Sequence, residues 1–309
     1  MLSFLPSHIL GITCIVLVTI NTLIWTIPVH ALAFAKCLVR FRAWQVRCTQ
    51  YLMSTVKGWL WGVIISLKLI QKITWDIEGV DDLSRHEWYF VNSNHQSWTD
   101  IVVLLNIFTF RIPFPKFFLK KELFYIPILG TAWWALDYPF MKRYSKEYLQ
   151  KHPQKRGKDL ETTRKACEKY RYTPVSILNF TEGTRFTFEK HRTQKSPYRQ
   201  LLRPKAGGFA YALNAMEGKI SNLLDVTIVY PEGPINFWNF LCGRVSHVIV
   251  RITKYVIPEE FLHGNYEDDP DFRERFQAWI RDLWEKKDAL INEILRQYQE
   301  TPTGIPATS

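Results

Sequence analysis

The chain has 309 residues, of which 47% are hydrophobic and 15% aromatic, which suits one sizeable packed domain with an appendage and excludes a disordered protein. Its net charge of +11 indicates an anionic partner: a nucleic acid, a membrane surface or a phosphorylated substrate. The five cysteines are scattered and odd in number, which excludes a disulfide framework and fits free thiols in a reducing compartment.

The most apolar segment lies near the N-terminus. Residues 9–35 contain no Lys, Arg, Asp or Glu, and as a straight helix they would be about 40 Å long, against a bilayer core of about 30 Å. Pro28 is expected to kink this helix or to end its deeper part. Residues 31–33 (ALA) resemble a signal-peptide cleavage site, but the start lacks a positive region and the apolar run is too long. The cations that follow predict a cytoplasmic C-terminal side: Lys36, Arg40, Arg42 and Arg47.

A second apolar stretch, residues 51–73, carries only Lys57, Lys68 and Lys72 as charges. It fits a second span, a helix lying in the membrane interface with its lysines reaching water, or a buried core helix. We predict that residues 1–73 form a membrane anchor, with one span followed by a second span or an interfacial helix.

Strand-like and helix-like segments alternate through the rest of the chain, which predicts an α/β fold with a mainly parallel sheet flanked by helices. The expected strands are residues 75–80, 88–91, 116–119, 137–143, 175–180, 225–230 and 245–252. The expected helices are residues 100–110, a surface helix within 145–169, one that starts at Gly207, and an amphipathic helix over 271–298. We assign residues 74–300 to this domain and expect a disordered tail over 301–309.

Two loops of the domain stand out by their composition. Residues 190–205 are basic and too long for a simple connection, and residues 235–241 (INFWNFL) are aromatic. The aromatic loop fits either insertion into lipid headgroups or ordinary core packing.

A histidine follows the second expected strand. His95 comes after three polar residues, and Asp100 lies five positions later, where the next helix begins. A carboxylate there can hold one imidazole nitrogen so that the other acts as a base toward a hydroxyl. A helix-capping loop histidine is the alternative. The same spacing recurs at His263 and Asp268, but in a polar segment without a preceding strand, which we interpret as solvated loop.

Reactive or anion-binding residues also follow other strands of the expected sheet, where function gathers in such folds. One strand ends in FMKR and another opens onto residues 181–185 (TEGTR). Gly183 allows a tight turn, and Arg185 offers a forked donor suited to phosphate. A surface salt bridge for Arg185 and a structural hydrogen-bond acceptor for Glu182 are the alternatives.

Four blocks resemble, in order and spacing, those of the lysophospholipid acyltransferase family, the PlsC-like 1-acylglycerol-3-phosphate acyltransferases. They are NHQSWTD, KKELFYIPILG followed by PFMKR, FTEGTRF, and LLRPKAGGF. The resemblance spans residues 75–231 and looks closest to the YihG-like bacterial branch and the animal lysocardiolipin-type enzymes. Thr181 and Lys142 replace the proline and aspartate that many members have.

The resemblance implies the glycerolipid acyltransferase fold and transfer of an acyl chain from acyl-CoA or acyl carrier protein to the sn-2 hydroxyl of lysophosphatidic acid. It makes His95 the general base, Asp100 the residue that orients it, and Lys120 an oxyanion donor. The residues that it assigns to glycerol phosphate are Arg143, Glu182, Gly183, Thr184 and Arg185, and Asn94 and Ser97 support the motif. No cofactor is needed, and no residue cluster has the spacing of metal ligands.

The expected partners are a phospholipid membrane, the acyl donor and the lysophospholipid acceptor, with the catalytic domain on the cytoplasmic face of a bacterial inner membrane. The basic surface suits an anionic leaflet. A nucleic-acid partner is disfavoured because the basic residues form no reading motif. The alternatives are another lysophospholipid acceptor, such as a lysocardiolipin type, glycerol 3-phosphate itself, or a non-catalytic lipid- or acyl-carrier-binding protein on the same scaffold.

Overall fold

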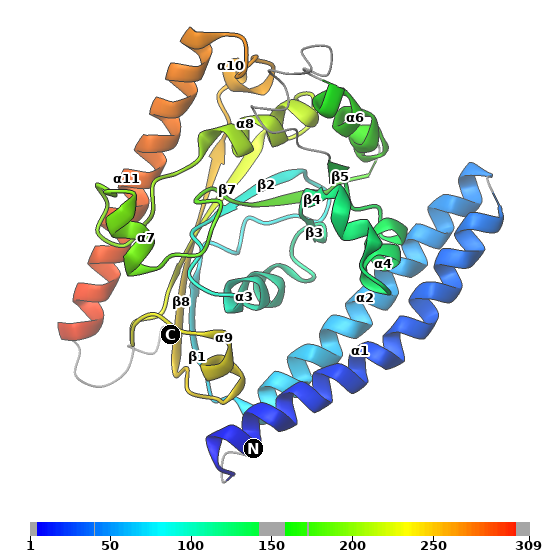
Figure 1. Ribbon diagram of the computed structural model, residues 1–309, viewed down its shortest axis with the longest axis horizontal. Coiled ribbons are helices and arrows are strands. Elements are labelled where there is room, and N and C mark those ends of the chain that lie inside the picture. The colour runs from blue at the N-terminus through cyan, green and yellow to red at the C-terminus, as the bar shows by residue number, and fades with distance from the viewer. Residues whose placement is uncertain (1–4, 40, 142–157, 172, 301–309) are drawn as a thin grey trace.

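The protein, described here from a computed structural model, combines a central sheet, helices on both faces of it, and a long N-terminal helical hairpin (Figure 1). The structure describes residues 5–39, 41–141, 158–171 and 173–300. The expected tail over 301–309 and all of residues 145–157 therefore lie outside the described residues.

The six-stranded sheet has the order β1-β8-β7-β2-β6-β3. Its parallel part comprises β7 (Asn222–Val229), β2 (Tyr89–Ser93), β6 (Ser176–Phe180) and β3 (Pro115–Lys116). β8 (His247–Val256) is antiparallel to β7, and β1 (Thr74–Glu78) runs with β8. The mainly parallel sheet was predicted, whereas the reversed pair was not. The connection from β7 to β8 contains no helix that crosses the sheet, so the chain returns as an antiparallel neighbour.

One expected strand is divided between two sheets. The predicted strand over 116–119 splits into β3, which extends the main sheet, and β4 (Leu119–Lys120). β4 pairs with β5 (Phe140–Met141) in a separate two-stranded sheet, next to the 3-10 helix η1 (Lys121–Tyr125) and α4 (Leu129–Ala135).

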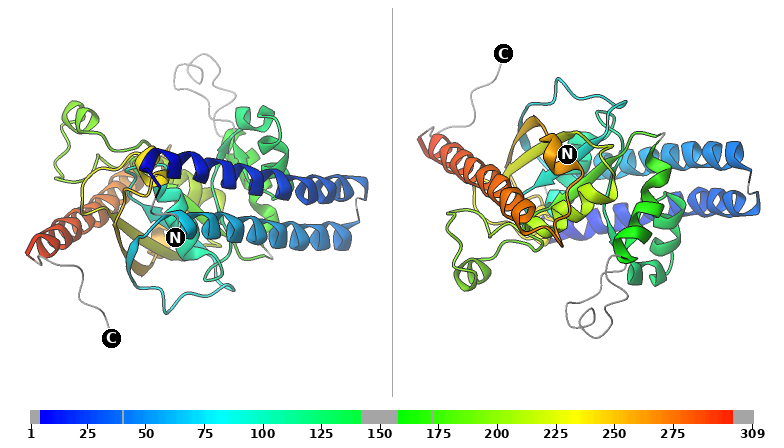
Figure 2. Two further views of the ribbon diagram at one scale, coloured as in Figure 1. Left: turned by 90° about the horizontal axis from the view of Figure 1, so that it is seen from below. Right: turned by 90° about the horizontal axis from the view of Figure 1, so that it is seen from above.

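Helices cover both faces of the sheet, and β2 is buried at each of its five positions because it lies between them. Tyr89 and Val91 pack with α3 (Thr99–Phe108) on one face. Phe90 packs on the other face, with α8 (Ala206–Ala215) and α11 (Pro270–Glu300) (Figure 2). The remaining short elements are α6 (Lys158–Cys167), η3 (Glu168–Arg171), α7 (Phe188–Thr193) and α10 (Glu259–Leu262).

The N-terminal hairpin consists of α1 (Ser7–Leu38) and α2 (Arg42–Ile70), both long and apolar enough to cross a membrane by length and composition. α1 continues as a helix through Pro28 to Leu38, so it does not end at the proline. The two helices pack closely at two glycines of α2 that are four residues apart. A Cβ at Gly58 would lie 2.2 Å from the Trp25 ring, and one at Gly62 would lie 2.0 Å from Oδ1 of Asn21, so a side chain at either position would require its neighbour on α1 to move.

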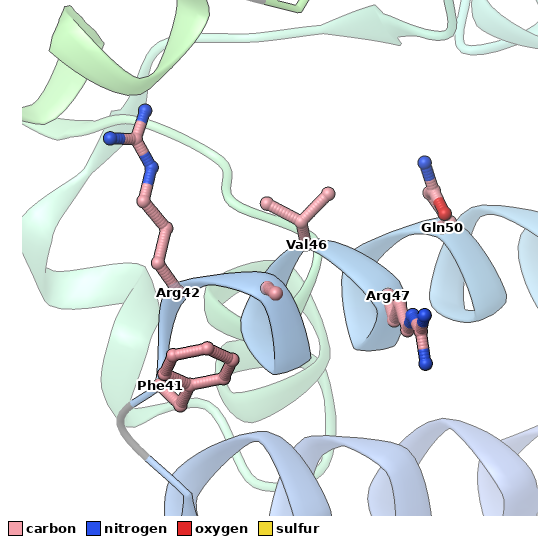
Figure 3. Close-up of a pocket in the computed structure, with 6 residues that line it drawn as sticks. Phe41, Arg42, Val46, Arg47 and Gln50 are labelled. Atoms are coloured by element: carbon pink, nitrogen blue, oxygen red, sulfur yellow. The ribbon is translucent and has the colours of Figure 1, made fainter.

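The turn between α1 and α2 combines apolar side chains with cations. Exposed Phe41 and Val46 lie beside Arg42 and Arg47 in a shallow hollow (Figure 3). Lys36, which the sequence groups with these cations, is instead buried and pairs with Asp137 at 2.9 Å. It therefore fixes the hairpin to the rest of the protein rather than presenting a charge to solvent.

The hairpin contacts the rest of the protein along most of its length. Near its start, Gly11 lies against Trp238 and Cys242. Towards its end, His30 contacts the Thr131 hydroxyl at 2.8 Å, and Lys36 also donates to the carbonyl of Ala135. From residue 11 to residue 36, α1 rises about 38 Å, so the contact is longer than a bilayer core of about 30 Å is thick.

The predicted aromatic loop contains a short helix, α9 (Phe237–Leu241), capped by Asn236, whose side chain accepts the backbone N–H of Asn239 at 2.7 Å. Phe240 is buried and Trp238 packs against the core, while Phe237 is 38% exposed. Core packing therefore accounts for most of this segment.

Candidate active site

Polar side chains gather at the edge of the sheet where the parallel strands end, as expected for an open α/β sheet. His95 follows β2, Glu182 follows β6 and Tyr230 follows β7. Because these strands are neighbours in the order β7-β2-β6, the three loops lie side by side.

The loop after β2 is fixed by Asn94. The side-chain amide of Asn94 donates to the carbonyl of Ile228 and accepts its backbone N–H, both at 2.9 Å. The asparagine side chain thus continues the hydrogen bonding between β2 and β7 for one step beyond β2. This contact holds the start of the histidine loop, and Asn94 is fully buried.

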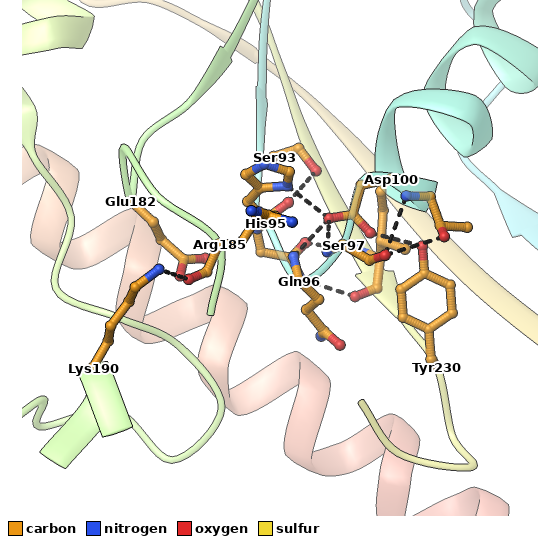
Figure 4. Close-up of polar contacts among 12 residues, drawn as sticks. Ser93, His95, Gln96, Ser97, Asp100, Glu182, Arg185, Lys190 and Tyr230 are labelled. Carbon is orange, nitrogen blue, oxygen red and sulfur yellow. Dashed lines mark hydrogen bonds and ion pairs between the residues drawn. The ribbon is translucent and has the colours of Figure 1, made fainter. Parts of the chain in front are cut away.

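Asp100 is a fully buried carboxylate that accepts four hydrogen bonds (Figure 4). Its Oδ2 accepts from Nδ1 of His95 at 2.8 Å and from the backbone N–H groups of Gln96 at 2.6 Å and Ser97 at 2.8 Å. Its Oδ1 accepts the hydroxyl of Tyr230 at 2.7 Å. Burial and the neighbouring Asp100 raise the pKa of Tyr230 well above its ordinary value, so the phenol remains a donor.

The His95 ring is held so that one nitrogen remains available. Since the Asp100 carboxylate accepts at Nδ1, that nitrogen carries the proton and Nε2 has the free lone pair. No hydrogen bond to Nε2 is found among the described residues. The Phe180 ring stacks on the imidazole at 3.9 Å with an interplanar angle of 13°. The orientation of the imidazole is therefore fixed by stacking on Phe180 and by the hydrogen bond from Nδ1 to Asp100.

Glu182 is a buried carboxyl group that contacts the backbone of the histidine loop. It is 1% exposed; its Oε1 accepts the backbone N–H of His95 at 3.1 Å, and its Oε2 accepts that of Leu202 at 3.2 Å. Burial raises the pKa of Glu182 to about 8, against the opposing effect of these two hydrogen bonds. The carboxyl group thus joins the histidine loop to the segment before α8, and both of its oxygens already have protein donors.

The turn after Glu182 presents cations. Gly183 has φ +66°, a conformation that favours glycine. The side chain of Lys205 packs over it, 3.1 Å from the position that a Cβ on Gly183 would take. The ammonium of Lys190 donates to the Thr184 hydroxyl at 2.7 Å. The guanidinium of Arg185 lies over the exposed Trp98 ring at 5.3 Å, a cation–π contact that leaves its N–H groups available.

A groove of about 430 Å³ opens beside the histidine loop. Its walls combine cations and aromatic rings. They comprise Gln96, Ser97, Arg185, Phe186, Thr187, Phe188, Lys190, Pro234, Ile235, Asn236 and Phe237. A ligand with a phosphate group and an apolar part matches this lining.

The remaining predicted site residues are Ser97, Lys120 and Arg143. Ser97 hydrogen-bonds Thr99 at 3.1 Å through its hydroxyl and supports the turn into α3. Lys120 is exposed in β4, and within the described chain its side chain makes no hydrogen bond or ion pair. Arg143 lies outside the described residues. The roles of Lys120 and Arg143 stay predictions.

The structure adds site residues that the sequence did not single out: Phe180, Leu202 and Tyr230. Tyr230 is the last residue of an expected strand. Functional residues gather where parallel strands end, which is why Glu182 was a candidate, and the same reasoning applies to Tyr230. The contact of Leu202 is made by its backbone and leaves no signal in the residue type. The second His–Asp pair behaves as interpreted: His263 is exposed at the end of α10, and no hydrogen bond joins it to Asp268.

Comparison with known proteins identifies the part of the chain that contains these active-site loops. A family model described as Acyltransferase matches residues 75–233, slightly more than half of the chain. The chain belongs to the acyltransferase family. The four active-site loops after β2, β6 and β7 and before α8 all lie within this match, whereas the hairpin, β8 and α11 lie outside it.

Individual relatives agree with this family. The chain is 29% identical over 205 residues to the 1-acyl-sn-glycerol-3-phosphate acyltransferase delta of Macaca fascicularis, covering 62% of this chain and 49% of the relative. It is 28% identical over 192 residues to the gamma protein of Homo sapiens, covering 59% and 46%. It thus spans about half the length of the curated relatives it matches. PlsC, the 1-acyl-sn-glycerophosphate acyltransferase of Thermotoga maritima, aligns with a TM-score of 0.47 and 19% identity over 87% of this chain and 98% of that chain.

Proposed function

We propose that this acyltransferase moves a fatty acyl chain from the thioester of acyl-CoA or acyl carrier protein to the sn-2 hydroxyl of lysophosphatidic acid. The observation that carries the proposal is the His95–Asp100 pair, which presents a free imidazole nitrogen beside a groove with cationic and aromatic walls. The names of the curated relatives support the choice of acceptor.

In the proposed reaction, Nε2 of His95 accepts the proton of the sn-2 hydroxyl while the hydroxyl oxygen attacks the thioester carbonyl carbon. Asp100 holds the imidazole in the required tautomer and stabilises the imidazolium that forms. The tetrahedral intermediate then loses its carbon–sulfur bond, and the imidazolium returns the proton to the departing thiolate. The products are the diacyl phospholipid and the free thiol, and no covalent acyl-enzyme is formed.

Cations supply the charge stabilisation in this scheme. Arg185, fixed over Trp98, provides a forked donor for the acceptor phosphate, and Lys205 adds a second positive charge above Gly183. Lys120 remains our expected donor to the oxyanion. Glu182 contributes indirectly in this proposal, by holding the backbone of His95, since its own oxygens are occupied.

We further propose that the hairpin rests in the cytoplasmic leaflet of the bacterial inner membrane. The solvent-facing side of α1 is apolar along its length, as at Ile12, Ile20 and Ile27. A bilayer-spanning hairpin would carry the catalytic domain into the hydrocarbon, because that domain contacts α1 over about 38 Å. The turn with Phe41 and Arg42 suits the headgroup region, where apolar and cationic groups are both accommodated (Figure 3).

The deciding experiment is an acyl-transfer assay in nanodiscs with oleoyl-CoA and lysophosphatidic acid, comparing wild type with His95→Ala. We expect turnover in the wild type and its loss in the variant, with circular dichroism unchanged. His263→Ala is the matched control, because it removes a histidine with the same spacing to an aspartate but without the contact, and it should retain full activity. Absence of wild-type turnover with acyl-CoA, acyl carrier protein and a panel of lysolipids would refute the proposal.

A further inference from the structure

A row of polar side chains crosses the middle of the sheet on the face covered by α11. In the strand register, Asn92 of β2 lies directly between Asn179 of β6 and Asp225 of β7. The inward positions just before the row on β2 and β7, Phe90 and Leu223, are apolar. A polar row in such a core is costly unless each group has a partner, and here each has one.

The row is connected by hydrogen bonds from one strand to the next. Asn92 donates its amide N–H to Oδ1 of Asp225 at 2.7 Å, and its carbonyl oxygen accepts the hydroxyl of Thr181 at 2.5 Å. Asn179 donates to the same hydroxyl at 2.8 Å. Thr181 immediately precedes Glu182, and Asn92 lies three residues before His95, so the row ends beside both active-site loops.

One cation completes the row from outside the sheet. Lys287 of α11 has a fully buried ammonium, 3.0 Å from Oδ2 of Asp225, and donates to the carbonyl of Val226 and the hydroxyl of Thr227 at 2.7 and 3.2 Å. Its charge and its three hydrogen-bonding positions are thus all used within the protein. A buried pair of this kind adds little net stability compared with apolar side chains of the same volume, so its presence calls for another reason.

The same face of α11 holds the site by a second route. Asp288 accepts the backbone N–H groups of Arg199 and Gln200 at 3.0 and 2.8 Å, and Trp284 donates its indole N–H to the carbonyl of Leu202 at 3.0 Å. Leu202 in turn donates to Glu182, which accepts the backbone N–H of His95. Positions 284, 287 and 288 have the spacing of one helix face, so a single surface serves both routes.

We propose that Lys287 and Asp288 are positioning residues of the acyltransferase site, through which α11 fixes the loops that carry His95 and Glu182. Neither residue touches the reacting atoms. Lys287 acts through Asp225 and Asn92 on the end of β2, and Asp288 acts through residues 199–202 and Glu182 on the backbone of His95. This inference rests on the proposed function for its effect on turnover, and it assigns a role in that site to a helix outside residues 75–233.

The first test is a split between kcat and KM. We would compare the charge-balanced double variant Asp225→Asn/Lys287→Met and the single variant Asp288→Ala with wild type. The double variant avoids an unpaired buried aspartate, so the fold survives even where Lys287→Met alone does not. The controls are Lys286→Met and Asp282→Ala, each of which breaks an exposed ion pair of the same helix beside Lys287.

The expected result is a fall in kcat of about 10- to 100-fold in both test variants, with KM for lysophosphatidic acid within about threefold of wild type. Melting temperatures should stay within a few degrees of wild type, and both controls should keep full activity. A folded double variant with wild-type kcat would overturn the proposal. The proposal would also be overturned if activity fell only in proportion to the fraction of folded protein.

The second test does not depend on turnover. Amide hydrogen exchange by mass spectrometry should become faster over residues 94–97 in both variants and over 199–202 in Asp288→Ala, while β8 stays protected. Unchanged exchange in these loops would also overturn the proposal, whatever the activity. If the wild type shows no acyl transfer at all, the proposed function fails, and the exchange experiment still decides whether α11 fixes the loops.

Discussion

Tyr230 donates its phenolic hydrogen to Oδ1 of Asp100 at 2.7 Å, across 130 residues of sequence. Three donors surround the other oxygen of the same carboxylate, and among the described residues Tyr230 is the one donor to Oδ1. The geometry of the histidine loop therefore depends on a residue at the end of a different strand, β7.

Removing this hydroxyl should slow catalysis without unfolding the protein. In Tyr230→Phe, Oδ1 of Asp100 remains buried without its donor, and the carboxylate can shift away from His95. We expect kcat to fall by roughly tenfold at unchanged KM, since a hydrogen bond to a charged group contributes about 1.5–3 kcal/mol. Tyr298→Phe, which removes a hydroxyl that contacts His247, is the control. Wild-type kcat in Tyr230→Phe would show that Asp100 needs no such restraint.

The buried Glu182 should give the protein a characteristic dependence of stability on pH. Burial raises the pKa of this carboxyl from 4.5 to about 8, so between these values the folded chain keeps a proton that the unfolded chain releases. The free energy of unfolding therefore falls as pH rises from about 5 to 8, and the contribution is complete only below the unfolded pKa. Glu182→Gln cannot ionise and should lack it.

Urea unfolding followed by tryptophan fluorescence measures this effect. Relative to Glu182→Gln, the wild type should lose free energy of unfolding as pH increases from 5 to 8. Comparing the two proteins at each pH cancels the contribution of the titratable groups that they share. A difference that stays constant with pH would mean that Glu182 does not hold a proton in the folded chain.

Arg185 should affect binding of the acceptor more than the chemical step. We expect Arg185→Ala to raise KM for lysophosphatidic acid by about 10- to 100-fold, because a charge-assisted contact to phosphate is lost. KM for oleoyl-CoA should change little. Arg192→Ala, which removes an exposed arginine of α7 on the same basic segment, serves as the control. An unchanged KM for the acceptor would exclude Arg185 from phosphate binding.

Cys37 reports the position of the hairpin turn. It is exposed near the end of α1, whereas Cys14, Cys48, Cys167 and Cys242 are buried. With the hairpin in the cytoplasmic leaflet, a membrane-impermeant maleimide should label Cys37 in inside-out vesicles and not in spheroplasts. Cys37→Ser should abolish the label. Labelling from the periplasmic side alone would mean that the hairpin crosses the bilayer.

What the sequence predicts well is local. The His95–Asp100 pair lies within one strand–helix connection, and periodicity identified the strand before it and the helix after it. The contacts of Tyr230, Leu202 and Lys287 depend on strand order and on the direction of the chain between β7 and β8. Neither is encoded in the spacing of apolar residues, so these partners could not be found from the residue pattern alone.

The same limit explains how Lys36 and Glu182 differ from their simplest interpretations. Lys36 follows an apolar run within α1, as a topology-determining cation does, but it is buried in a pair with Asp137. Glu182 stands in a phosphate-binding block, yet the neighbouring loops bring two backbone donors to its oxygens. In both cases a distant segment supplies the partner that changes the environment of the side chain.

The contacts of Asp100 also explain why four residues separate it from His95. One carboxylate oxygen receives the imidazole and two successive amides, so the chain from 95 to 100 closes as a ring around a single atom. A ring with one residue more would turn an amide or the imidazole away from that atom, although every reactive group would still be present. The interval is thus a requirement of chain closure, and insertion of one glycine after Ser97 should cost as much activity as loss of the aspartate.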